Sequence, residues 1–245
     1  MKKMRVDLLL VERGMVESRS MAQKLVMAGQ VRANGQVVAK SSMEYPPEVA
    51  LEIIQGPPYV SRGGEKLAGA FKAFGLDVRG LVCADVGAST GGFTDCLLQN
   101  EANKVYAIDV GNGILHWKMR QDERVIVMEG TNARYVDSLP EPVDFITIDA
   151  SFISLKILLP VIRQWFAEQG RAVVLVKPQF EAGKKEAARR KGVIKDSSIH
   201  RRVLKEILAA ATSEQFEVLG LKVSPITGPK GNVEFLLYLR HPAAA

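Results

Sequence analysis

The chain has 245 residues, of which 47% are hydrophobic and 24% charged, so its length suits one large domain with a smaller one and its composition is that of an ordinary globular protein. The longest apolar runs, residues 157–162 and 172–176, are far shorter than the ~18 residues that a membrane-spanning helix needs, and the start of the chain lacks the apolar core of a signal peptide. The two cysteines, Cys83 and Cys96, lack metal-ligand spacing and fit reduced core residues. These features favour a cytoplasmic protein without a membrane span or a metal site.

Positive charge is concentrated in two segments of the chain. The net charge is +6, yet residues 1–40 contribute +5 (eight Lys/Arg against three Asp/Glu) and residues 176–205 contribute +7 (ten against three). Lys and Arg side chains bind the phosphates of nucleic acids. The distribution therefore indicates a polyanionic partner, although either segment alone also fits a solvated helical face.

The first part of the chain shows the pattern of a small α+β domain. Residues 6–13 and 20–27 have helical spacing, and Asn34-Gly35 then stands between two β-type runs, which is a strong hairpin signal. With its basic residues, this pattern resembles the αL RNA-binding domain of a small-subunit ribosomal protein (the S-four type). We expect such a domain over residues 1–58.

The consecutive prolines Pro57 and Pro58 stop regular structure and, with the glycines that follow, predict a linker over residues 59–66. Beyond it, over residues 67–245, near-continuous apolar runs alternate with helical patterns, as in an α/β fold with a parallel sheet buried on both faces. The expected strands are residues 81–86, 104–110, 125–128, 143–148 and 172–177. Helices are expected over 153–168 and 197–212, and an antiparallel hairpin over 217–224 and 232–240 at the sheet edge. This organisation predicts a Rossmann-like fold.

A glycine-rich turn follows the first expected strand. Asp85 closes that strand in D-V-G-A-S-T-G-G-F, and the glycines let a ligand approach the backbone where a helix starts. The spacing differs from G-x-G-x-x-G because Ser89 takes the second position, which counts against a nicotinamide cofactor. Asp109, which ends the second strand, can accept both ribose hydroxyls of an adenosine.

Together with the end of the third strand, these features resemble the S-adenosylmethionine (SAM) site of the class I methyltransferases. The expected cofactor-binding residues are Asp85, Gly87, Ala88, Ser89, Thr90, Gly91, Gly92, Phe93, Asp109, Asn132 and Ala133.

Three charged residues sit at strand ends that are otherwise apolar, namely Asp149, Lys177 and Glu234, and Lys66 from S-R-G-G-E-K-L adds a second ammonium group to two carboxylates and one lysine. A charge at the end of a buried strand is costly unless it is paired or used. Lys–Asp–Lys–Glu in this order resembles the catalytic tetrad of FtsJ-type ribose 2′-O-methyltransferases. With the first domain and Y-V-S-R-G-G-E-K-L, the chain is similar over both domains to the TlyA (haemolysin A) family. One departure is Pro57, where members of that family often carry a basic residue.

The chemistry that this resemblance implies needs a base. Methylation of a ribose hydroxyl removes a proton from a very weak acid while its oxygen attacks the methyl group. A lysine can be the base only if its pKa falls, which burial and a second ammonium group favour. We assign Lys177 as the general base and Lys66 as the second cation, which holds the hydroxyl or stabilises the developing oxyanion. Asp149 and Glu234 would orient the lysines, with Asp149 close to the methyl group.

The second basic segment, residues 183–195, follows the proposed base directly, and we expect it to form a loop that grips RNA backbone. The expected RNA-contacting residues are Arg5, Arg19, Lys24, Arg32, Arg62, Lys184, Lys185, Arg189, Arg190 and Lys191. Phe152 and Phe180 are candidates for stacking against an unstacked target base.

The resemblance implies SAM-dependent ribose 2′-O-methylation of ribosomal RNA, on free RNA or on a ribosomal subunit, and we expect a cytidine of the large subunit as the target. A non-catalytic protein that binds RNA and SAM is the alternative, against which the intact tetrad argues. A membrane-active cytolysin, suggested by the older family name, is disfavoured because the apolar segments are too short to span a bilayer.

Overall fold

The computed structural model describes residues 3–54 and 56–242, which form two compact units divided after Pro58. The segment 59–66, expected as a linker, is instead packed within the larger unit. The amide of Val60 donates to Asp95 Oδ2 at 2.8 Å, and helix α3 (Gly63–Phe74) begins inside the segment. A Cβ at Gly64 would lie 2.2 Å from the Tyr59 side chain, so this glycine allows the two residues to pack closely. The prediction of a linker over residues 59–66 is therefore wrong.

The smaller unit combines two short helices with short antiparallel strands. Its elements are β1 (Met4–Arg5), α1 (Val6–Glu12), α2 (Arg19–Met27), β2 (Val31–Ala33), β3 (Gln36–Val37), β4 (Glu44–Tyr45) and β5 (Leu51–Ile53). Strand β2 pairs with β3 and β5, and β1 pairs with β4. Asn34 and Gly35 have positive φ angles, 49° and 78°, and form the predicted tight turn between β2 and β3. Apolar side chains of α1, α2 and β2 make the core.

Asp7 is fully buried in the smaller unit and organises three side chains around it. Its carboxylate accepts hydrogen bonds from Arg5 (3.0 and 2.9 Å), Arg19 (2.9 Å) and Gln23 (3.0 Å). Arg5 foremost, and then Gln23 and Arg19, hold the pKa of Asp7 well below its usual range. Arg5 and Arg19, two of the predicted RNA contacts, are therefore fixed by an internal carboxylate.

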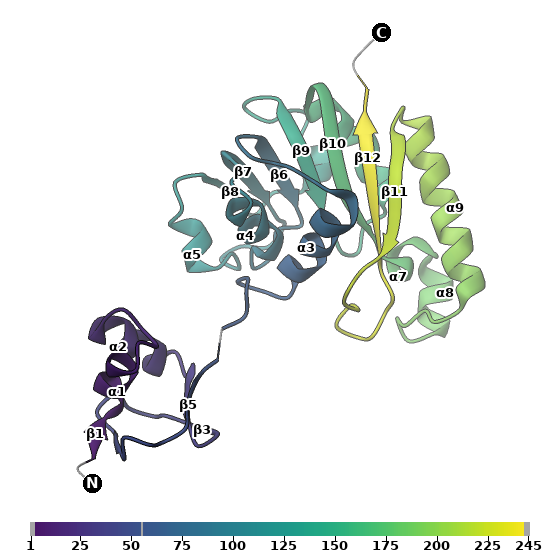
Figure 1. Ribbon diagram of the computed structural model, residues 1–245. Coiled ribbons are helices and arrows are strands. Elements are labelled where there is room, and N and C mark those ends of the chain that lie inside the picture. The colour runs from purple at the N-terminus through teal and green to yellow at the C-terminus, as the bar shows by residue number, and fades with distance from the viewer. Residues whose placement is uncertain (1–2, 55, 243–245) are drawn as a thin grey trace. The chain divides into compact units, whose positions relative to one another are not determined.

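The larger unit is built on a seven-stranded sheet with the order β11-β12-β10-β9-β6-β7-β8 (Figure 1). Its strands are β6 (Val82–Val86), β7 (Lys104–Ile108), β8 (Val125–Met128), β9 (Val143–Ile148), β10 (Phe166–Val176), β11 (Glu217–Val223) and β12 (Phe235–His241). The five strands β6, β7, β8, β9 and β10 run parallel, and β12 and β11 add an antiparallel hairpin at one edge. The predicted Rossmann-like sheet with its C-terminal hairpin is confirmed.

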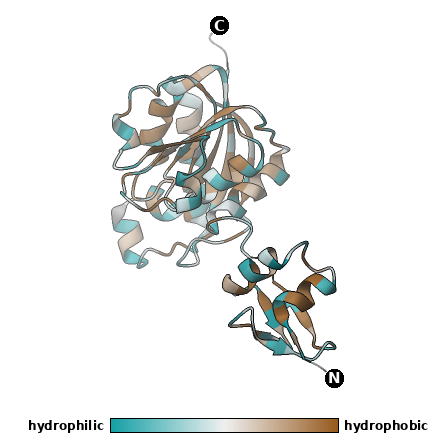
Figure 2. Ribbon diagram, turned by 90° about the vertical axis from the view of Figure 1, so that its left-hand side faces the viewer, coloured by the Kyte–Doolittle hydropathy of each residue, from teal (hydrophilic) through white to brown (hydrophobic). Residues whose placement is uncertain are grey.

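Helices cover both faces of this sheet. The remaining elements are α4 (Gly92–Gln99), α5 (Trp117–Arg120), α6 (Leu155–Ile162), α7 (Pro178–Glu181), α8 (Lys184–Arg189), α9 (Ser197–Ser213) and the 3₁₀ turns η1 (Ala133–Tyr135) and η2 (Arg163–Trp165). Helices α3, α4 and α5 share one apolar core with the sheet, and α6 and α9 share the other. Figure 2 shows the strands as largely apolar, which follows from their burial on both faces.

Two expected boundaries differ from the structure. The helix expected over 153–168 ends at Ile162, and Phe166 instead begins β10, where it pairs with Val143 of β9. The Phe166 ring also packs against Phe216 and His241, so tertiary contacts override the helical pattern. The segment 183–195, expected as a loop, contains α8, because its K-K-E-A-A-R run is made of good helix formers.

Asp7→Ala should destabilise the smaller unit by about 2 kcal/mol, because hydrogen bonds to a charged group contribute ~1.5–3 kcal/mol each and the released arginines regain only part of that from water. Hydrogen exchange of the α1 and α2 backbone amides in the full chain measures this change, and exchange roughly 30-fold faster is expected. The control Glu12→Ala removes an exposed carboxylate at the end of α1 and should leave exchange unchanged. Equal protection in Asp7→Ala and the wild type would contradict the structural role of Asp7.

Candidate active site

The carboxyl ends of β6, β7, β9 and β10 meet at one edge of the sheet, where α/β folds bind their ligands. After β6 the chain turns at Gly87, whose φ is +83°, and the amides of Gly87 and Ala88 donate to Ile108 O at 2.8 and 3.1 Å. A Cβ at Gly87 would lie 2.9 Å from the backbone of Ala150, so only glycine fits. The glycine-rich motif is thus a tight strand-to-helix turn that ends where α4 begins.

A cavity of about 300 Å³ lies beside this turn. Its lining includes five predicted cofactor residues, namely Gly87, Ser89, Asp109, Asn132 and Ala133. Asp109 is fixed by the backbone, since its Oδ2 accepts from Ser89 N and its Oδ1 from Gly111 N, both at 2.8 Å. A carboxylate oxygen has a second lone pair, so Asp109 can still accept hydrogen bonds from the hydroxyls of a ribose.

A second, larger cavity of about 1300 Å³ adjoins the first. Its lining includes four more predicted cofactor residues, Ala88, Thr90, Gly92 and Phe93, and two predicted RNA contacts, Arg62 and Lys191. Asp149, Ser151 and Phe152 line both cavities. The two spaces therefore meet at the residues that follow β9.

The four predicted catalytic side chains converge in one ion-pair network. Asp149 stands between the lysines, with Oδ1 2.5 Å from Lys177 Nζ and Oδ2 3.6 Å from Lys66 Nζ. Lys66 also donates to Glu234 Oε2 at 2.7 Å. Both lysines are 7% exposed and Glu234 is 2% exposed, so each of these buried charges is compensated by an opposite charge.

Further acceptors orient Lys177, which follows β10 and precedes α7. Its Nζ donates to the backbone oxygen of Asp149 and to Ser151 Oγ, both at 3.1 Å. Its contact with Asp149 Oδ1 is an ion pair without the angles of a hydrogen bond. The same nitrogen lies 5.8 Å from the centre of the Phe180 ring. These contacts hold Lys177 in the wall of the larger cavity, beside Asp149, which lines both cavities.

Phe152 has an unusual environment for a large apolar residue. Its side chain is 91% exposed and its φ is +66°, a conformation that is uncommon outside glycine. Its ring centre lies 4.9 Å from that of Phe180, so the two aromatic residues singled out in the sequence are neighbours beside Lys177. Backbone strain of this kind concentrates at ligand sites.

Three polar residues of the site were missed in the sequence: Ser151, Gln179 and Asn232. Gln179 Nε2 donates to Glu234 Oε1 at 3.2 Å. Asn232 accepts from Ile194 N and donates to Gly192 O, both at 2.9 Å, and so ties the chain after α8 to the approach of β12. Each of the three lies two positions from a tetrad member, which is the signal that would have found them.

Asp85 does not line either cavity, nor does Gly91. The Asp85 side chain is fully buried and accepts hydrogen bonds from the hydroxyls of Thr94 (2.7 Å) and Thr147 (3.0 Å). Burial raises the pKa of Asp85 to about 7, against the opposing effect of these hydroxyls. The expectation of direct cofactor binding by Asp85 is corrected, because the carboxyl is fully buried and links β6 to α4 and β9.

The predicted RNA contacts fall into two groups. Lys24 and Arg32 of the smaller unit and Lys185, Arg189 and Lys191 of the larger unit are exposed. Arg190 is also exposed, but it is paired with Glu186 and Asp196. The side chain of Lys184 lies outside the described part of the structure.

The parallel sheet, the glycine turn and the fixed carboxylate after the second strand define a class I SAM-dependent methyltransferase. The chain belongs to the FtsJ-like methyltransferase family, which matches residues 59–241, and within it to the TlyA (haemolysin A) group, since an S4 domain matches residues 4–49. The family resemblance noted in the sequence is confirmed.

Close relatives extend over almost the whole chain. A Bacillus subtilis protein provisionally named as the rRNA methyltransferase YqxC is 47% identical over 98% of this chain and 87% of its own length. The 16S/23S rRNA (cytidine-2′-O)-methyltransferase TlyA of Mycobacterium tuberculosis is 41% identical over 98% of this chain and 90% of its own. A solved structure from Streptococcus thermophilus with a provisional hemolysin name has 44% identity and a TM-score of 0.73, covering 99% of this chain and 90% of that one.

Within residues 3–54 and 56–242, no helix combines the length and the apolar character needed to cross a bilayer. The same residues contain no group of three His, Cys, Asp or Glu side chains placed to hold a metal ion. Cys83 and Cys96 are both buried and unbonded to each other.

Asp85→Asn should change how stability depends on pH. In the unfolded chain an aspartate has a pKa of about 3.9. Because the folded pKa is raised to about 7, the folded state retains a proton between these values, and the contribution of Asp85 to stability is full below pH ~4 and falls as the pH rises towards 7. The variant lacks this loss, so relative to the wild type it should gain stability between pH 5 and pH 8, by at most ~1.4 kcal/mol per pH unit.

Denaturant unfolding at pH 5 and pH 8 measures this difference. The control Asp77→Asn removes an exposed carboxyl whose pKa Arg79 lowers to about 2, so its effect should be the same at both pH values. A difference between wild type and Asp85→Asn that does not change with pH would refute the raised pKa.

Proposed function

We propose that this chain transfers a methyl group from SAM to the ribose 2′-oxygen of a cytidine in large-subunit ribosomal RNA, on free RNA or on a ribosomal subunit. The observation that carries the proposal is the buried Lys66–Asp149–Lys177–Glu234 network at the junction of the two cavities. One cavity has the size and polar groups for a nucleoside, and the other offers exposed aromatic and basic side chains for RNA.

SAM, when bound, supplies an electrophilic methyl group on a positively charged sulfur. The residues of the smaller cavity suit it, because Asp109 has acceptor capacity for the ribose hydroxyls and Gly87 leaves the backbone open to close approach. The first amides of α4 suit a carboxylate such as that of the methionine moiety. Asp149, which lines both cavities, supplies the negative charge that a sulfonium requires.

Lys177 is the residue proposed to remove the proton. Its Nζ would accept the proton of the ribose 2′-hydroxyl while the oxygen bonds to the methyl carbon and the carbon–sulfur bond of SAM breaks, which leaves S-adenosylhomocysteine; the proton would then pass to solvent. For this step Lys177 must be neutral beforehand.

Lys66 has a different role from Lys177. Two carboxylates contact its Nζ, Glu234 at 2.7 Å and Asp149 at 3.6 Å, and they compensate its positive charge. A fixed cation in a water-poor site stabilises the negative charge that develops on the ribose oxygen. Gln179, through its hydrogen bond to Glu234, helps to orient this half of the network.

Phe152 and Phe180 form the proposed platform for the target base. Aromatic side chains stack on unpaired bases, with ~1–3 kcal/mol per base, and a nucleotide must leave its helix to reach a recessed site. Arg62, Lys191 and Lys230 line the same cavity and suit the flanking phosphates. The choice of cytidine follows the names of the Mycobacterium tuberculosis and Campylobacter jejuni relatives, and the choice of the large subunit follows the name of the second, a 23S rRNA (cytidine-2′-O)-methyltransferase.

Methyl-labelled SAM with unmodified 23S rRNA or large subunits should place label on the ribose of one cytidine, as mapped by nuclease protection and mass spectrometry. Lys177→Ala should bind SAM normally but lower kcat by about 10²–10⁴-fold, the usual contribution of a general base. The control Lys222→Ala, on the exposed face of β11, should retain activity. Label on a base or on protein, or a wild type that binds SAM and RNA without methylating, would reject the function. A fully active Lys177→Ala would reject only the base assignment.

Phe152→Ala should lower kcat/KM for RNA by about 5–150-fold, the equivalent of losing one stacking contact, and leave the affinity for SAM unchanged. Phe152→Trp keeps a ring and should retain most activity. Phe152→Gly relaxes the positive φ but has no ring, so it should lose as much activity as the alanine variant. A fully active Phe152→Gly would show that the ring does not bind the base.

A further inference from the structure

Glu129, the residue after β8, holds the backbone of the segment 111–115. Its Oε1 accepts the amides of Ile114 and Leu115, and its Oε2 accepts the amide of Gly113, each at 2.9 Å. Three successive amides thus converge on one carboxylate, as in a backbone anion nest. The Glu129 side chain is only 11% exposed, so water competes little for these hydrogen bonds.

Arg120 closes this arrangement from the other side. Its guanidinium forms an ion pair with Glu129 Oε2, and its Nε donates to Leu115 O at 3.0 Å. Arg120, followed by the backbone amides, lowers the pKa of Glu129 to about 2. Glu129 is therefore ionised at neutral pH, so its carboxylate can accept all three amides.

The segment 111–115 contacts two parts of the proposed cofactor site, the smaller cavity and the glycine turn. On one side Ile114 lines the smaller cavity, and the amide of Gly111 donates to Asp109 Oδ1. On the other side, a Cβ at Gly91 of the glycine turn would lie 2.9 Å from Leu115, so the two segments are packed tightly. Glu129 itself lines neither cavity, so any effect it has on a ligand passes through this segment.

We propose that Glu129 is a positioning residue for SAM, which sets the segment 111–115 in its binding conformation before the ligand arrives. This inference rests on the proposed function, because it takes SAM as the ligand. The segment begins Gly111-Asn112-Gly113, and a glycine-rich chain without a tether populates many conformations. A site that is already ordered binds more tightly, because the ordering does not have to occur at the moment of binding.

Glu129→Gln tests the proposal with little change in volume. The glutamine carbonyl can replace Oε1, but its NH₂ group would face the Gly113 amide and Arg120, which are both donors. Calorimetric titration with SAM, and separately with S-adenosylhomocysteine, should show affinities about tenfold or more weaker for the variant. At saturating SAM, kcat should stay within about twofold of the wild type, and KM for RNA should not change.

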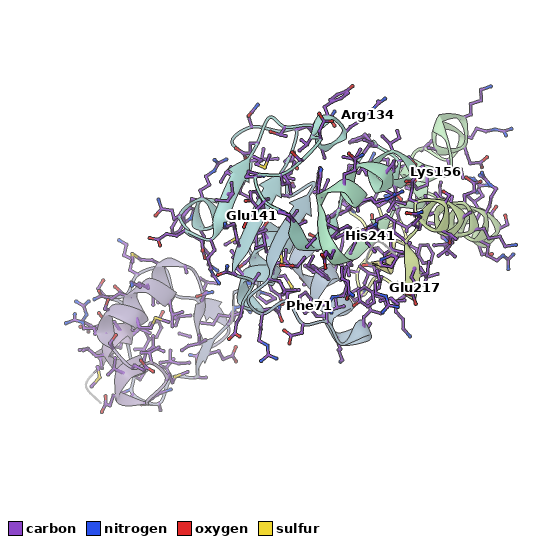
Figure 3. All side chains as sticks on the ribbon, turned by 90° about the horizontal axis from the view of Figure 1, so that it is seen from above. Phe71, Arg134, Glu141, Lys156, Glu217 and His241 are labelled. Carbon is purple, nitrogen blue, oxygen red and sulfur yellow. The ribbon has the colours of Figure 1, made fainter. Side chains whose placement is uncertain are left out.

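Glu141→Gln is the matched control. Glu141, labelled in Figure 3, also pairs with a cation, Lys104, and accepts from the Tyr106 hydroxyl at 2.8 Å, but it lies just before β9 at the opposite ends of the strands. This variant should bind SAM as the wild type does. The proposal is overturned if Glu129→Gln binds SAM with wild-type affinity, or if kcat falls while SAM affinity is retained.

Arg120→Lys provides the second variant if Glu129→Gln does not fold. It keeps a positive charge but loses the hydrogen bond to Leu115 O. Its affinity for SAM should therefore be about threefold weaker than that of the wild type, a smaller loss than in Glu129→Gln. Unchanged SAM affinity in this variant would also count against the proposal. A wild-type protein that fails to bind SAM would instead refute the proposed function, and that result is distinct from a loss confined to the variants.

Discussion

In the larger unit, one carboxylate forms ion pairs with two buried lysines, and the fold has to bring these three side chains together. Asp149 lies 2.5 Å from Lys177 Nζ and 3.6 Å from Lys66 Nζ, and Glu234 compensates Lys66 from the other side. Removal of one member of a buried ion pair leaves an uncompensated charge, which costs several kcal/mol (~3–5). The network is therefore stable only if the fold brings all its members together, and two of them, Lys66 and Glu234, are 168 positions apart.

The sheet topology meets this demand through the direction of its strands. Asp149 and Lys177 follow parallel strands and so lie at the same sheet edge, as do all residues that follow β6 to β10. Glu234 precedes β12, and because β12 is antiparallel to β10 its first residue, Phe235, stands opposite Val176. A parallel strand in this place would put Glu234 at the far edge. The C-terminal hairpin is thus a requirement of the site as well as an edge of the sheet.

The same sequence signal found the tetrad and misplaced Asp85. A charged residue at the end of an apolar run is conspicuous because its burial is costly, and for Asp149 and Lys177 the reason is an opposite charge. For Asp85 the reason is two threonine hydroxyls, one from Thr94 in α4 and one from Thr147 in β9. A continuous apolar run hides which face a residue points to, since both faces are buried. Uncharged Ser151 and Gln179 carry no such signal, and only their spacing of two positions from Asp149 and Lys177 would have pointed to them.

Charge counts in the sequence also overstate the number of cations that are free to bind RNA. Arg5 and Arg19 are held by Asp7, and Arg190 by acidic neighbours, whereas Lys24 and Lys185 are simply exposed. An arginine that is paired in this way can still bind RNA, because Asp7 accepts a hydrogen bond only from the Nε of Arg19 and leaves its terminal nitrogens available. An arginine fixed in this way loses less conformational freedom when a phosphate binds. Asp7 in the smaller unit and Glu129 in the larger are therefore alike, since each is a shielded carboxylate that accepts hydrogen bonds from several donors and holds them in place.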